Sequence, residues 1–127
     1  MNNLAEKITD SELEVMQVLW DAGESLPVTE IRRELQRRRS WESTTVKTLI
    51  QRLYAKGVLR QEKREVYYYT PLISRGEYSD YANKSFIDRL YRGSAKNLVA
   101  ALVESNGLSE EDMAELRSLF HVEGGHA

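Results

Sequence analysis

The sequence predicts a mainly α-helical protein that contains one small β-hairpin. Two observations carry this prediction. Three stretches with the apolar periodicity of helices precede two short runs of strand-forming residues, and three further helical stretches follow them. There is no internal repeat and no low-complexity segment, so the 127 residues fit one compact domain or a small domain with an appended element.

The first two helices are marked by their start signals. Thr9 and Glu12 form a capping box, in which a threonine N-cap is followed three residues later by a glutamate. Apolar residues then recur on one face as far as Asp21, and Gly23 ends the helix. A second helix is expected from near Pro27, because proline suits the first turn.

The third helix has the clearest pattern. Its inner stripe repeats at helical spacing and consists of Val46, Leu49, Ile50 and Leu53. The opposite face is small, polar and cationic, and no acid lies on it. That face consists of Thr44, Thr48 and Gln51, with Lys47 and Arg52 on its flanks. Gly57 is expected to stop the helix in a left-handed conformation.

A β-hairpin is expected next. Val58-Leu59 and residues 66–70 have strand-forming composition, and the connection between them, residues 60–65, is wholly polar. Three helices followed by a hairpin, in this order, predict a winged helix over residues 1–73. In that fold the third helix can enter the major groove while the hairpin tip lies along the DNA backbone.

The remainder, residues 74–127, reads as three helices at about 77–92, at 94–105 and after an N-cap at Ser109. Such short helices cannot bury their apolar side chains alone, so they pack on the winged helix or pair with a second copy. We expect a second copy, because twofold proteins commonly read inverted half-sites. The expected dimer contacts are Tyr78, Phe86, Leu90, Leu98, Leu102, Leu116, Leu119 and Phe120.

Charge favours a polyanionic partner for the middle of the chain. Residues 32–64 hold eleven Lys or Arg against three acids, whereas six basic residues face nine acids from Leu72 onward. Short donors and acceptors on the third helix suit base edges, and Lys63 and Arg64 at the hairpin tip are expected to contact phosphates. The alternative is a winged helix that serves as a protein–protein interaction module without sequence-specific DNA binding.

Composition argues against other classes. The chain has no cysteine, its only histidines are His121 and His126, and it contains neither a catalytic motif nor a phosphate-binding loop. We therefore expect no enzyme activity, no cofactor and no metal site. No apolar run reaches the length of a membrane span, and the first residues do not resemble a secretion signal, so the expected location is the cytoplasm.

The residues also resemble a known family. Residues 8–16 with Leu19-Trp20, then Trp41, residues 45–53 and Lys56-Gly57, are similar to the opening and recognition helix of the penicillinase and methicillin-resistance repressors (BlaI/MecI). Residues 67–71 resemble the wing strand of that family. Phe86, residues 90–94 and the stretches 108–111 and 115–117 resemble its dimerisation region. The similarity runs through nearly the whole chain.

This resemblance implies a homodimeric repressor on an inverted-repeat operator with a core like TACA…TGTA. It implies DNA contacts at Thr44, Thr45, Lys47, Thr48 and Arg52. Some family members are relieved by cleavage of an Asn-Phe bond through a membrane sensor-protease, and Ala101-Leu102 stand at that position here. A copper-responsive branch carries a C-terminal cysteine motif that this chain lacks. An upstream sensor or protease, the inducing signal and the regulated genes therefore do not follow from the sequence.

Overall fold

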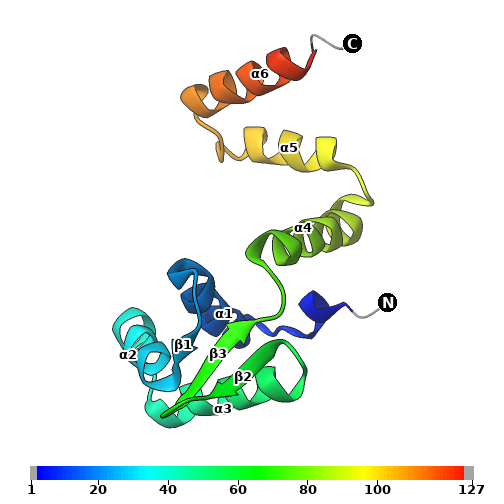
Figure 1. The fold of residues 1–127 in the computed structure, drawn as a ribbon. Helices are drawn as coiled ribbons and strands as arrows, with labels where there is room; N and C mark the ends of the chain where they lie inside the picture. Colours follow the sequence, from blue (N-terminus) through cyan, green and yellow to red (C-terminus); the bar gives the residue numbers. More distant parts are fainter. Residues whose placement is uncertain (1–2, 125–127) are drawn as a thin grey trace. The chain divides into compact units, whose positions relative to one another are not determined.

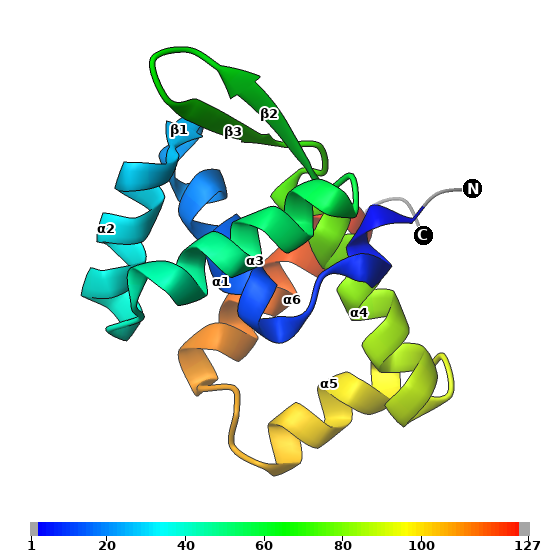
Figure 2. The same cartoon turned by 90° about the horizontal axis from the view of Figure 1, so that it is seen from below.

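The computed structural model describes residues 3–124, with side chains through Phe120, so the final residues, His126 among them, lie outside it. Residues up to Ala82 form one compact unit and those from Asn83 form a second (Figures 1 and 2). The elements of the first unit are η1 (Leu4–Lys7), α1 (Asp10–Ala22), β1 (Leu26–Pro27), α2 (Val28–Arg39), α3 (Ser43–Ala55), β2 (Leu59–Lys63) and β3 (Tyr67–Pro71). Helix α4 (Arg75–Tyr91) begins in the first unit and ends in the second, which also holds α5 (Ala95–Glu104) and α6 (Glu110–Gly124).

The first unit confirms the predicted winged helix. Helices α1, α2 and α3 pack on one another, and the β2–β3 hairpin extends beyond them as the wing (Figure 2). The capping box at Thr9 and Glu12 is present with both of its hydrogen bonds, and Gly23 ends α1 in the left-handed region at φ 70°. The inner faces of α1, α2 and α3 form one continuous core, and the apolar stripe predicted for α3 is buried in it.

The sheet differs from the expected two-stranded hairpin. It has three antiparallel strands in the order β1-β3-β2, and Leu26 of β1 pairs with Tyr69 of β3. The two residues of β1 are too few to show a strand periodicity in the sequence, and Pro27 serves as the N-cap of α2 rather than as its first helical residue. Strand β2 also continues to Lys63, although the sequence predicts residues 60–65 as a polar connection, because backbone pairing with β3 does not require apolar side chains.

The second unit is built differently. None of the described side chains of α4 or α5 is fully buried, and no two of its helices pack extensively on one another within the described chain. Ser94 caps α5 by accepting a hydrogen bond from the backbone N–H of Asn97, and Ser109 accepts one from the N–H of Asp112 at the start of α6. The three predicted helices are therefore present, but they lack a core of their own.

Candidate nucleic-acid interface

Helix α3 presents an exposed outer face. The face forms because the buried stripe at Val46, Leu49 and Leu53 turns every intervening polar side chain outward. All six side chains predicted to contact DNA from this helix are exposed: Thr44, Thr45, Lys47, Thr48, Gln51 and Arg52. No acidic residue occurs between Ser43 and Ala55, so nothing within the helix repels a phosphate.

The hydroxyl of Thr48 is already engaged in the helix. Its Oγ1 donates a hydrogen bond of 2.9 Å to the carbonyl oxygen of Thr44, one turn earlier. The hydroxyl proton is therefore used locally, and the groups left to a partner are the methyl group and an oxygen lone pair. A thymine methyl or a base-edge donor would match them.

The wing carries alternating aromatic and cationic side chains. The ammonium of Lys63 lies 5.9 Å from the ring centre of Tyr67, and the guanidinium of Arg64 lies 4.2 Å from that of Tyr68. Tyr67 and Tyr68 are neighbours in β3, so their side chains point to opposite faces. The two predicted wing contacts therefore lie on opposite faces of the hairpin.

The face of the wing that turns toward the core is held by Tyr69. This residue pairs with Gln61 across the strands, and its hydroxyl donates to Gln61 Oε1 at 3.2 Å. Burial raises the pKa of the Tyr69 hydroxyl, so it stays a neutral donor. This contact fixes the register that carries Lys63 to the end of β2.

Intramolecular ion pairs remove some cations and leave others. Within residues 32–64, the pairs involve Arg37 and Arg38 with Glu34, Arg38 with Asp21, Arg39 with Glu14, Lys56 with Glu12, and Arg64 with Glu62. Four cations of α3 and the wing have no ion pair among the described residues: Lys47, Arg52, Arg60 and Lys63. Arg32 and Arg33 of α2 also have no ion pair among the described residues, so the uncompensated charge of residues 32–64 lies on α2, α3 and β2. The part on α3 and β2 includes Lys47, Arg52 and Lys63, which were predicted to contact DNA.

A buried carboxylate fixes the end of α3. Glu12 is 1% exposed, and the ammonium of Lys56, directly after α3, donates to its Oε1 at 2.6 Å and to the carbonyl oxygen of Lys7 at 2.8 Å. The same Oε1 closes the capping box of α1. The start of α1 and the end of α3 are thus joined through one side chain, which holds the outer face of α3 at a set angle on the core.

Three exposed residues at this surface were not predicted. Tyr54 is 48% exposed and follows Lys47 by seven residues, nearly two helical turns, so it shares that face. Tyr67 is 41% exposed, and Arg60 is exposed in β2. Extending the helical wheel of α3 by one turn would have found Tyr54, whereas Tyr67 and Arg60 required the strand register.

The residues predicted for a dimer interface fall into two groups. Tyr78 is half-buried against the first unit, with its ring centre 5.7 Å from that of Trp20, and burial raises its pKa. In the second unit the apolar side chains lie largely in the open: Phe86 is 39% exposed, Leu90 63%, Leu102 39%, Leu119 64% and Phe120 71%, while Leu98 and Leu116 are intermediate. Ala101 and Leu102 lie within α5.

The part of the chain with described residues contains no group of three or more His, Asp or Glu side chains able to hold a metal ion. None of its helices combines the length and apolarity that a membrane crossing requires.

Comparison with known proteins gives a consistent result. The sequence model of the penicillinase repressor family matches residues 8–121. The penicillinase repressor of Bacillus licheniformis is 36% identical over 115 residues, covering 90% of this chain and 89% of the relative. The methicillin resistance regulatory protein MecI of Staphylococcus aureus (strain N315) is 31% identical over 122 residues, covering 95% and 98%.

Solved structures also match part of the chain. The solution structure of the DNA-binding domain of the repressor BlaI aligns with a TM-score of 0.54 at 37% identity, over 61% of this chain and 94% of that one. The monomeric form of Bacillus licheniformis BlaI in complex with the blaP half-operator aligns with a TM-score of 0.50 at 38% identity, over 56% and 87%.

Proposed function

We propose that this chain, which belongs to the penicillinase repressor family, is a homodimeric, sequence-specific DNA-binding repressor of transcription. The observation that carries the proposal is the exposed, acid-free outer face of α3, where Lys47 and Arg52 have no ion pair among the described residues. A major groove accepts one α-helix, and its base edges offer partners to threonine, glutamine and arginine side chains.

One subunit reads one half-site. Helix α3 lies in the major groove, where Thr44, Thr48 and Gln51 meet base edges and the flanking cations reach guanine or phosphate. The wing lies along the DNA backbone, where Lys63 contacts phosphates from one face of the hairpin and Arg64 contacts them from the opposite face. The likeness to monomeric BlaI in complex with a half-operator supports the binding of one subunit to one half-site.

The second unit supplies the twofold contact. Its helices expose large apolar side chains, and their described residues form no core of their own, an arrangement expected of an element that is completed by a second copy. Two subunits then present two α3 helices to half-sites about 34 Å apart, one turn of the duplex. The matching DNA is an inverted repeat with the family-type core TACA…TGTA.

The chain acts by binding rather than by catalysis, and it works in the cytoplasm, the compartment of the DNA that it regulates. Occupancy of an operator blocks transcription of the adjacent genes. The position of Ala101-Leu102 in place of an Asn-Phe bond favours relief by a route other than cleavage at that bond.

Selection from a random duplex pool tests the proposal. The wild-type chain is expected to enrich an inverted repeat, which is then used in fluorescence anisotropy titrations. Lys47→Ala and Arg52→Ala should each weaken operator binding, by about 1–3 kcal/mol where a base edge is read.

Lys84→Ala is the matched control. The side chain of Lys84 in α4 is 79% exposed, and among the described residues its one ion pair is with Asp88, so the variant removes one surface cation without touching α3. Operator affinity should stay at the wild-type value in this variant. A pool that yields no enriched sequence would contradict the proposal and favour a protein-binding role for the winged helix.

A further inference from the structure

The first turn of α4 is anchored to the winged helix. Ile73, just before it, is buried in the core, and its carbonyl oxygen accepts a hydrogen bond of 3.0 Å from the indole N–H of Trp20. Ser74 and Glu77 form a reciprocal cap, in which each side chain accepts from the other's backbone N–H at 3.0 and 2.9 Å. Helix α4 therefore starts from a fixed point.

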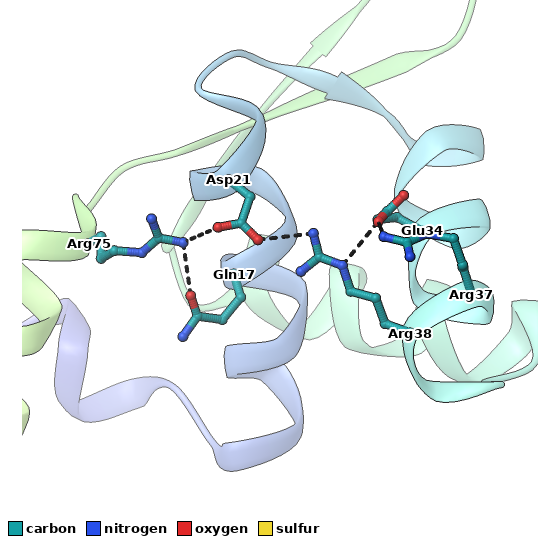
Figure 3. Close-up of polar contacts among 6 residues, drawn as sticks. All are labelled: Gln17, Asp21, Glu34, Arg37, Arg38 and Arg75. Atoms are coloured by element: carbon teal, nitrogen blue, oxygen red, sulfur yellow. Dashed lines mark hydrogen bonds and ion pairs between the residues drawn. The ribbon is translucent and has the colours of Figure 1, made fainter.

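Asp21 holds this start from the side. Its Oδ1 accepts from the guanidinium of Arg75, the first residue of α4, at 2.5 Å, and its Oδ2 lies 2.9 Å from the guanidinium of Arg38 near the end of α2 (Figure 3). Arg75 also donates to Gln17 Oε1 at 3.0 Å and lies 5.7 Å from the ring centre of Trp20. One carboxylate in α1 thus joins the first residue of α4 to α2.

Arg38 also contacts a second carboxylate besides Asp21. Its Nε donates to Glu34 Oε1 at 3.1 Å, and Glu34 also pairs with Arg37 (Figure 3). The second contact orients the Arg38 guanidinium, so that its free edge meets Asp21. These bonds from Arg75 and then Arg38 lower the pKa of the Asp21 carboxyl.

The place of Asp21 in its own helix is unfavourable. It is the second-last residue of α1, where the helix dipole presents its negative end and disfavours a carboxylate, and the last turn of α1 contains no basic residue. Local helix formation therefore does not explain an aspartate here. The two arginines from other helices do explain it.

We propose that Asp21 is a positioning residue that fixes the direction in which α4 leaves the winged helix and thereby sets which operator spacing the dimer accepts. The inference rests on the proposed function, since spacing matters only to a dimer that reads two half-sites. One additional base pair between the half-sites moves them by about 3.4 Å and rotates them by about 35°. When Asp21 holds Arg75, α4 resists this displacement more than when it is held only by buried Ile73 and by the packing of Tyr78 and Tyr81 on the core.

The test compares whole operators with half-sites in the full-length chain. The probes are the inverted repeat enriched by the wild-type protein, the same repeat with one base pair added or removed at its centre, and a duplex with one half-site. The variants are Asp21→Asn and Arg75→Gln, which remove either partner of the ion pair between Asp21 and Arg75, called the clamp below.

The matched control is Glu14→Gln. Glu14 also lies in α1, and it pairs with one arginine of α2, Arg39, at 3.0 Å, but it has no contact to α4 among the described hydrogen bonds and ion pairs. It tests whether loss of any α1–α2 ion pair has the same effect.

Both clamp variants should bind the half-site as the wild type does, within about twofold, while their preference for the native spacing falls by about two- to fivefold, as expected for exposed ion pairs. Glu14→Gln should keep the full preference. Salt should weaken the wild-type preference toward that of Asp21→Asn, because exposed pairs are screened.

An unchanged spacing preference in both clamp variants would overturn the inference, and so would an equal loss on the half-site, which indicates a general loss of structure. A wild-type dimer that binds the operator without a spacing preference would also overturn the inference, whereas a wild-type chain that binds as a monomer would refute the homodimer of the proposed function. The wild-type titration alone shows which of the two has failed.

Discussion

Phe120→Asp is the perturbation that tests the assembly most sharply. Phe120 is 71% exposed in the chain, so about 140 Å² of an aromatic side chain of about 200 Å² is open to a partner. At about 25 cal/mol per Å², covering it contributes about 3.5 kcal/mol per subunit, or about 7 kcal/mol for the two copies in a twofold dimer. Complete loss raises the dimer dissociation constant about 10⁵-fold, and half of that loss raises it about 300-fold.

The assay is sedimentation velocity at micromolar concentration, with circular dichroism as a check on folding. The Asp side chain adds an unpaired carboxylate to the interface, so the variant should sediment as a folded monomer. Ser118→Asp is the control, because it adds the same charge at an exposed position about 200° away from Phe120 on α6. A Phe120→Asp protein that remains dimeric, with operator affinity like that of Ser118→Asp, would refute the reasoning.

Three further predictions concern α3, the wing and Asp21. In anisotropy titrations, Thr48→Val should keep operator affinity within about twofold, whereas Thr48→Ala should lose about 1–3 kcal/mol of binding free energy. The reason is that the hydroxyl proton is used within the helix and the methyl group is exposed to a partner. Equal losses in the two variants would assign the contact to the hydroxyl. Lys63→Ala should weaken binding to the operator and to a random duplex alike and should reduce the salt slope of binding by about one. Arg64→Ala should have a smaller effect on both, because Glu62 neutralises Arg64. A loss of affinity confined to the operator would mean that the wing reads bases. The lowered pKa of Asp21 means that its ion pairs stabilise the fold above the ordinary value of 3.8 and cease to do so as the pH falls through the lowered pKa. The difference in Tm between wild type and Asp21→Asn should therefore be present at pH 7 and vanish in strong acid, and a difference that persists there would argue against this origin.

The helices of the first unit could be predicted from the sequence because local signals and burial agree there. Thr9 with Glu12 announces α1, and the stripe from Val46 to Leu53 is buried as its spacing predicts. The same agreement explains the exposed outer face of α3, because its position follows from that of the buried stripe. The DNA contacts themselves stay predictions.

What the sequence did not reveal depends on contacts between distant residues. Strand β1 exists only through its pairing with β3. That Lys63 and Arg64 lie on opposite faces of the hairpin can be deduced only from the strand register. The contact of Asp21 with Arg75 joins residues 54 positions apart, and although an aspartate near a helix C-terminus is locally unfavourable, nothing in the neighbouring sequence identifies its partner. The first unit likewise extends to Ala82, nine residues past the expected boundary at 73, because Tyr78 and Tyr81 pack against the core.

The central claim, a dimer that reads an inverted repeat through two α3 helices, is tested most directly by sedimentation of the chain with a fluorescent operator duplex. We predict two chains per inverted repeat and an affinity about 10³-fold or more above that for a random duplex of the same length and salt concentration. One chain per repeat, or equal affinity for the two duplexes, would contradict the account.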